Sequence, residues 1–140
     1  MMLSKKIIYI ALLASTLLFA SVVLEQVLKY YQENTLMQHP EAIQSLTLRA
    51  NDGSKDAAFL LATAYKEGKL GQQDVSKAMF WYKKAAKMGD EDAMLMLGWL
   101  YYKGSATLMV DEEKARYWFS KASEKGLDEA LEMLDLLENG

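Results

Sequence analysis

The hydrophobic positions at the N-terminus form one unbroken segment. Residues 7–24 are 18 consecutive residues without a charge, a glycine or a proline, preceded by Lys5 and Lys6 and followed by Glu25. A helix of this length rises about 27 Å, close to the thickness of the hydrocarbon core of a bilayer. The segment therefore predicts a transmembrane anchor. Because basic flanks stay in the cytoplasm, residues 1–6 are expected to be cytoplasmic and the remainder to lie outside the inner membrane, in a bacterial periplasm.

A cleaved signal peptide is the main alternative to this anchor. Signal peptides have a shorter apolar core, of roughly 7–15 residues, and small residues at the third and first positions before the cleavage site. Cleavage after Ala20 or Ser21 would place Leu18 or Phe19 at the third position, and neither side chain is small. An uncleaved anchor is therefore favoured, while a cleaved signal and a buried core helix of a soluble protein stay open.

Further along the chain, apolar residues recur at three- and four-residue spacing, which is the period of an amphipathic helix. This spacing predicts helices over residues 56–67 and 92–103, each followed by a glycine that suits a left-handed helix end. Asp74 and Asp111 are placed to cap a second helix in each case, and each second helix again ends at a glycine. The pattern thus predicts two helical hairpins.

The two hairpins are copies of one sequence unit. Ala57, Leu61, Tyr65 and Gly68 recur 36 residues later as Ala93, Leu97, Tyr101 and Gly104. Lys77, Ala78, Lys84, Ala85 and Gly89 recur 37 residues later as Lys114, Ala115, Lys121, Ala122 and Gly126. The extra residue falls in the loop inside the hairpin, where a structural repeat tolerates insertions.

Weaker copies of the unit lie on both sides of these hairpins. Residues 25–55 are expected to continue the N-terminal helix outward and then to form a degenerate second helix that opens at Pro40. Residues 56–90 and 91–127 are the two complete units. Residues 128–140 start a third first helix whose outer face is acidic, as a terminal cap needs.

The two complete units resemble the Sel-one-like repeat (SLR), a relative of the tetratricopeptide repeat (TPR). The matching residues of the first unit are Ala57, Leu61, Tyr65, Gly68, Asp74, Lys77, Ala78, Trp81, Lys84, Ala85, Ala86 and Gly89. Those of the second unit are Ala93, Leu97, Gly98, Tyr101, Gly104, Asp111, Lys114, Ala115, Trp118, Lys121, Ala122 and Gly126. The departures are Ala62 for glycine, Ser123 for alanine and a missing second loop glycine.

This resemblance implies a short α-solenoid of SLR/TPR-like helical hairpins that serves as a platform for other proteins. Together with the N-terminal segment, the expected fold class is all-α, with one transmembrane helix preceding the solenoid.

Composition excludes several kinds of chemistry. The chain has no cysteine and one histidine, His39, in a linker before a proline, so neither a thiolate nor a histidine-rich metal site can be assembled. Beyond residue 24 there are 14 basic and 19 acidic residues, a balance that argues against nucleic acid and against docking on an anionic membrane surface. We expect no catalytic residues, no cofactor, no metal and no small-molecule substrate.

Two acidic clusters, residues 90–92 and 111–113, leave one enzymatic alternative, a carbohydrate hydrolase that uses surface carboxylates. Their positions at predicted helix starts favour a simpler role, because carboxylates in a first turn interact favourably with the helix dipole.

Aromatic residues that differ between the units indicate where a partner would bind. Trp99 and Tyr102 stand where the first unit has Thr63 and Lys66, on the side of the helix that lines the concave face in this architecture. Exposed aromatic residues are typical of protein-binding surfaces. The candidate partner-binding surface consists of Phe59, Thr63, Lys66, Leu95, Trp99, Tyr102 and Leu136. The alternative is that the two aromatic residues pack against the neighbouring unit or the N-terminal helix.

These observations predict a non-catalytic, membrane-anchored scaffold for protein–protein interaction, or an accessory subunit of an inner-membrane complex. Its partners would be one or more proteins, and the segment from Ile7 to Leu24 would hold it in the membrane. The alternative is a cleaved, soluble periplasmic repeat protein that binds or regulates cell-envelope enzymes.

Overall fold

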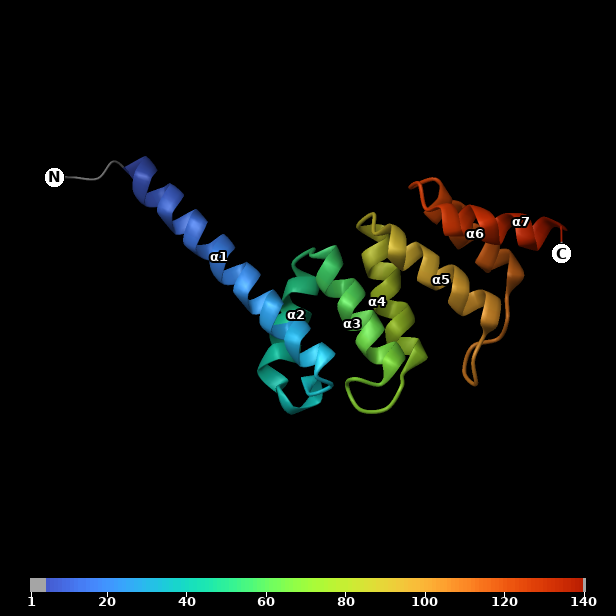
Figure 1. Ribbon diagram of the computed structural model, residues 1–140, viewed down its shortest axis with the longest axis horizontal. Coiled ribbons are helices and arrows are strands. Elements are labelled where there is room, and N and C mark those ends of the chain that lie inside the picture. Colours follow the sequence, from blue (N-terminus) through green and yellow to red (C-terminus); the bar gives the residue numbers. More distant parts are fainter. Residues whose placement is uncertain (1–4, 140) are drawn as a thin grey trace.

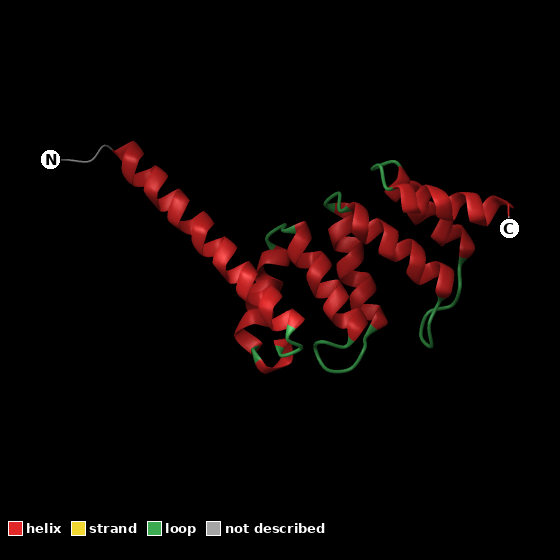
Figure 2. Cartoon of the chain, viewed as in Figure 1, coloured by secondary structure: helices red, strands yellow, loops and turns green. Residues whose placement is uncertain are grey.

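The computed structural model describes residues 5–139, with side chains from residue 13 onward. Residues 1–4, which belong to the expected cytoplasmic segment 1–6, lie outside the described residues, as does Gly140. The elements in chain order are α1 (Lys5–Gln32), η1 (Leu36–Gln38), α2 (Pro40–Asn51), α3 (Lys55–Glu67), α4 (Val75–Lys87), α5 (Glu91–Lys103), α6 (Glu112–Ser123) and α7 (Asp128–Asn139). The part of the chain that is described contains no strand (Figure 2), so the all-α expectation is confirmed.

The helices are arranged as a solenoid. Each helix packs against the next one along the chain, and α3 with α4 and α5 with α6 form the two complete hairpins. The loops inside these hairpins lie along one edge of the array, and the turns between successive hairpins lie along the opposite edge (Figure 1). α1 projects from one end, on the side of the turns.

The first helix is longer than the expected anchor. It continues without a break to Gln32, and a short 3-10 turn then leads into α2. All side chains of residues 13–19 are exposed, whereas Val27, further along the same helix, is 2% exposed. Within the described residues, one stretch is long and apolar enough to cross a membrane, Leu13–Gln32 with a mean hydropathy of 1.3, and a signal sequence near an N-terminus has the same properties.

A side-chain cap starts each helix of the two hairpins. Asp74 and Asp111 accept hydrogen bonds from the backbone N–H three residues later, at 2.9 and 3.0 Å, which confirms their expected role. Ser54 and Asp90 cap α3 and α5 in the same way, at 3.3 and 2.7 Å. Burial raises the pKa of the Asp90 carboxyl above its ordinary value. Gly68 ends α3 with φ 73°, the left-handed conformation expected there.

Two large rings at equivalent positions fill the centres of the hairpins. Tyr82 on α4 and Phe119 on α6 are both 0% exposed. Opposite Phe119 lies Gly98, where an added Cβ would come within 2.5 Å of the Phe119 Cδ1 atom. The first hairpin has Ala62 at the position of Gly98, and it is also fully buried. The second hairpin therefore needs glycine at this position because a side chain would collide with the Phe119 ring. The backbone of Gly98 has ordinary helical geometry and does not itself require glycine.

The residue after this small position also changes with the ring. In the first hairpin, Thr63 Oγ1 lies 2.9 Å from the Tyr82 hydroxyl, and burial raises the pKa of that hydroxyl to about 12. In the second hairpin, Trp99 replaces the threonine and meets the edge of the Phe119 ring at 5.7 Å between centroids. A polar pair in one unit thus corresponds to an aromatic pair in the other, so the second unit places a tryptophan where the first has a small side chain.

Replacing Gly98 by alanine is expected to destabilise the fold by about 1 kcal/mol. Overpacking a core costs about 1–3 kcal/mol, and the gain of about 1 kcal/mol in helix propensity offsets part of that cost. Urea unfolding followed by circular dichroism measures the change. Because Phe119→Leu removes the ring atoms in the way, the Gly98→Ala, Phe119→Leu double variant should lose less than the sum of the two single variants. A Gly98→Ala protein more stable than the parent would contradict the close contact.

The last helix that the structure describes is α7. Ala130 on α7 corresponds to Ala93 on α5. Ala130 is buried against α6, as Ala93 is buried against α4. Further along, Asp135 stands where α5 has Gly98, and its side chain is exposed. A carboxylate at this position does not favour the packing of a buried ring such as Phe119 against α7.

Candidate protein-binding groove

A groove of about 970 Å³ lies between the C-terminal ends of α3 and α5 and is bordered by the first turn of α7. Its apolar lining comes from Val75, Met96, Trp99 and Leu100, and its charged lining from Lys66, Glu67, Lys103 and Glu129. Apolar and aromatic surface edged by polar groups is the usual composition of a protein-binding site. We refer to this feature as the groove.

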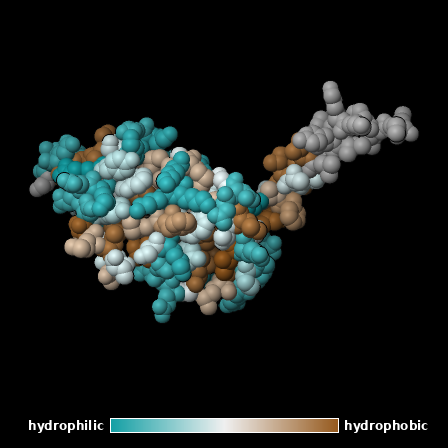
Figure 3. Space-filling view, turned by 180° about the vertical axis from the view of Figure 1, so that it is seen from behind, coloured by the Kyte–Doolittle hydropathy of each residue, from teal (hydrophilic) through white to brown (hydrophobic). Residues whose placement is uncertain are grey.

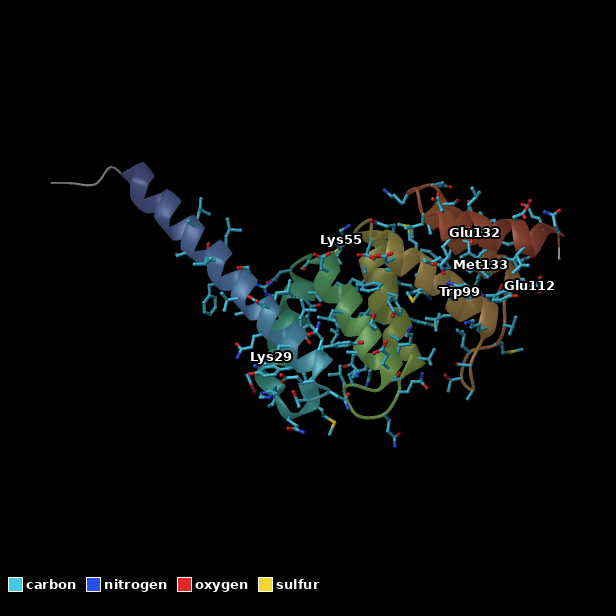
Figure 4. The ribbon with its side chains drawn as sticks, viewed as in Figure 1. Lys29, Lys55, Trp99, Glu112, Glu132 and Met133 are labelled. Atoms are coloured by element: carbon cyan, nitrogen blue, oxygen red, sulfur yellow. The ribbon has the colours of Figure 1, made fainter. Side chains whose placement is uncertain are left out.

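Trp99 is held in the groove by neighbours from three helices. Its Nε1 donates a hydrogen bond to Glu129 Oε1 of α7 at 3.0 Å. Its ring meets Phe119 of α6 and Tyr102 of α5 edge-on, at centroid distances of 5.7 and 5.8 Å. The Lys103 ammonium lies 4.5 Å from the ring centroid, a cation–π contact. Figure 4 shows Trp99 on the side of α5 that faces α7. Trp99 therefore packs against the neighbouring elements and still contributes surface to the groove.

Two ammonium groups and two carboxylates line the groove. Neither Lys66 nor Lys103 forms an ion pair with any residue that the structure describes. Both carboxylates already accept hydrogen bonds from the protein, Glu67 from the Tyr31 hydroxyl and Glu129 from the indole. A hydrogen bond from a neutral donor does not cancel the charge of a carboxylate, so a ligand meets charges of both signs in the groove.

Two of the seven residues of the predicted surface line the groove, Lys66 and Trp99. Phe59 and Thr63 instead surround Tyr82, with the Phe59 ring 5.5 Å from the Tyr82 ring. These two side chains are half-buried.

The other three predicted residues lie apart from the groove lining. Leu95 is 6% exposed, so it is a core residue and not part of an exposed surface. Tyr102 is half-buried and contributes through its contact with Trp99. Leu136 on α7 is 52% exposed and lies outside the residues that line the groove.

Sequence reasoning missed several groove residues. Lys103 follows Trp99 by one helical turn, and that spacing is a signal from which it could have been found. Glu129 carries no such signal, because its contact with Trp99 depends on how α7 lies relative to α5.

The acidic clusters serve the helix starts. A hydrogen bond from the Lys114 side chain holds the pKa of the Asp111 carboxyl below its usual range, and the Lys77 backbone N–H does the same for Asp74. Among the described residues, no three or more histidines, aspartates or glutamates come together as metal ligands would. His39 stacks on the Tyr30 ring with 3.6 Å between the ring centroids.

Two segments of the chain match the profile of the Sel1 repeat family, residues 55–90 and 91–127. Together they make up half of the sequence. A search of curated proteins gave no match.

Several solved structures are similar. A Sel1 repeat protein from Oxalobacter formigenes is 38% identical with a TM-score of 0.63, over 69% of this chain and 28% of that one. A protective antigen present in uropathogenic Escherichia coli strains, displaying an SLR fold, is 30% identical with a TM-score of 0.62, over 66% of this chain and 20% of that one. The chain thus spans less than a third of the length of either protein. Helicobacter pylori cysteine rich protein B shares the fold at 24% identity, with a TM-score of 0.64, over 81% of this chain and 93% of that one.

Proposed function

The chain belongs to the Sel1 repeat family, and on that premise we propose that it is a membrane-anchored, non-catalytic scaffold or an accessory subunit of an inner-membrane complex. Proteins of this family are typically protein-interaction scaffolds. The observation that carries the proposal is an exposed apolar helix attached to a repeat array that offers a groove.

The exposed part of α1 supports an anchor. Leu17, Leu18 and Phe19 are 70%, 69% and 73% exposed, and Figure 3 shows hydrophobic surface on the part of α1 that projects from the repeats. Removing side chains of this size from water gains roughly 1.5–3 kcal/mol each. A bilayer supplies that burial, whereas the rest of the chain does not. Lys5 and Lys6 then favour a cytoplasmic N-terminus and a periplasmic array.

The groove supports binding of a protein segment. Trp99 offers a large ring that its neighbours hold in one position, so little conformational entropy is lost when a partner packs on it. Lys66 and Lys103 add two cations at the same site. The best fit is a segment of a partner protein that packs an apolar side chain on Trp99 and offers polar or charged groups to the lysines and glutamates around it.

A cleaved, soluble form of the same binding protein is the second candidate. The observation that favours it is that residues 13–19 are all exposed, so their removal leaves the core of the array covered. In that case the groove would act on partners within the periplasm, such as enzymes of the cell envelope.

Intact-mass measurement of the protein recovered from a bacterial host separates the two candidates. We expect the mass of the uncleaved chain, and a protein that stays in the membrane pellet after alkaline carbonate extraction. A chain that lacks residues 1–19 should move to the soluble fraction. A mature protein shortened by roughly 20 residues, as signal cleavage produces, and extracted by carbonate would overturn the anchor and support the soluble form.

A further inference from the structure

The loop inside the second hairpin exposes two apolar side chains. Met109 and Val110, the two residues before the cap of α6, are 88% and 58% exposed, and Met109 is the most exposed of the large apolar side chains that the structure describes. In the first hairpin, the two residues before the cap of α4 are Gln72 and Gln73. The second loop thus presents an apolar pair where the first presents two amides. We refer to Met109 and Val110 as the loop tip.

Backbone hydrogen bonds hold the loop tip on both sides. Before the tip, Ser105 and Leu108 exchange two bonds: the Ser105 N–H donates to the Leu108 carbonyl at 2.7 Å, and the Leu108 N–H donates to the Ser105 carbonyl at 3.3 Å. After the tip, the Asp111 N–H donates to the Tyr101 carbonyl at 2.9 Å. A segment that is already held in this way loses little conformational entropy when a partner binds it.

The loop tip and the groove lie at the same edge of the array, but they do not meet within one chain. The groove is lined by the ends of α3 and α5 and by Gly104 and Ser105 at the start of this loop, whereas Met109 and Val110 are not among its lining residues. This edge is opposite to the turns, on whose side α1 projects (Figure 1). An anchor in α1 would therefore hold the loop tip away from a bilayer, which leaves another protein molecule to cover it.

The loop tip and the start of α6 match the lining of the groove. A methionine thioether packs favourably on an aromatic ring, and Trp99 offers such a ring. Four charged side chains of the two surfaces form no ion pair with any residue that the structure describes, and these are Glu112, Glu113, Lys66 and Lys103. Lys114 gives the same segment a cation to set against the two glutamates of the groove. The two surfaces are thus complementary in both apolar side chains and charge.

We propose that two copies of the chain associate by exchanging loop tips, so that Met109 and Val110 of each copy lie in the groove of the other, beside Trp99. This inference rests on the groove as a protein-binding site, as proposed above, and it does not require the membrane anchor. In a two-fold dimer each contact is made twice. A different protein that binds the groove has to displace the loop tip, so the concentration of the chain itself controls access to the groove.

Disulfide trapping of the full chain in mild detergent tests which surfaces meet. The chain has no cysteine, so a Met109→Cys protein can be mixed with a differently tagged Gln73→Cys protein. Gln73 is exposed and lines the groove. Mild oxidation should join the two chains. Lys87→Cys is the control, because Lys87 is exposed on α4 and does not line the groove. Equal yields with Gln73→Cys and Lys87→Cys would indicate random collision and overturn the exchange.

Analytical ultracentrifugation measures how much the loop tip contributes. The Met109→Gln, Val110→Gln double variant gives the second loop the two residues that the first loop carries, so its unfolding by urea should be unchanged. We expect its dimer dissociation constant to rise at least about tenfold, as when a side chain that matters is lost from an interface. Phe80→Gln is the matched control, since Phe80 is 61% exposed on α4 and lies outside the groove. A parent protein that does not self-associate, or a double variant that self-associates as strongly as the parent, would overturn the exchange.

Binding of a partner protein to the same double variant separates this inference from the function proposed for the groove. Because the competing loop tip is removed, the double variant should bind a partner more tightly than the parent does. If self-association is unchanged in the double variant while Trp99→Ala still weakens partner binding, the exchange is overturned and the proposed function stands. If the dimer is lost as expected but partner binding does not depend on Trp99, the exchange stands and the groove serves self-association alone.

Discussion

Replacing Phe119 by alanine should lower the free energy of unfolding by about 3–5 kcal/mol, the range for removing a fully buried phenylalanine ring. The ring is 0% exposed and packs on Gly98, which has no side chain to move into the space left behind. Small domains have total stabilities of about 5–15 kcal/mol. A repeat array this short is therefore expected to be largely unfolded under mild denaturing conditions after this one change.

Urea unfolding of the full chain in mild detergent, followed by circular dichroism, measures the loss. Phe80→Ala is the matched control, because Phe80 lies on the helix α4 and is 61% exposed. It should change stability by no more than about 0.5 kcal/mol. Equal effects of the two substitutions would show that the second hairpin does not depend on the ring of Phe119.

Replacing Trp99 by alanine is expected to weaken binding of the partner by about 2 kcal/mol, or about 30-fold, the size of effect found for a tryptophan at the centre of an interface. The partner is first captured by cross-linking in native membranes, and its affinity for purified variants is then measured. Tyr117→Ala is the control, since Tyr117 is 55% exposed on α6 and is not among the residues that line the groove. It should leave the affinity unchanged.

A second variant separates binding from folding, because Trp99 also packs on Phe119. Lys103 is exposed, so Lys103→Glu leaves the core intact and reverses one of the charges that line the groove. We expect weaker binding by this variant with unchanged unfolding. If both Trp99→Ala and Lys103→Glu bind the partner as the parent does, the groove is not the binding site.

Much of the fold was predictable because its determinants are local. Apolar spacing predicts α3 and α5 to within one residue at their starts, and Asp74 and Asp111 mark the starts of α4 and α6 as their caps. These signals depend on neighbours within one helical turn. The continuation of α1 past the apolar segment was expected, but its end at Gln32 was not evident, because polar residues after Glu25 do not by themselves show where a helix stops.

The groove was harder to predict because its determinants act between helices. The fit between Gly98 and Phe119 joins two helices, and the bond between Trp99 and Glu129 joins two more. Neither pair has a fixed sequence spacing, since each depends on crossing angles. A comparison of the two units identified Trp99 as different. It did not identify Leu95 as buried, because an apolar residue is compatible with both a buried and an exposed position.

The shared register of α5 and α7 has an evolutionary consequence. Ala130 meets α6 at the same place where Ala93 meets α4, so every junction between units presents the same pair of surfaces. An in-frame duplication of residues 91–127 would therefore insert a new hairpin between α6 and α7 without altering either neighbour. The number of units can change in one genetic step, and each step would move α7 further from α1.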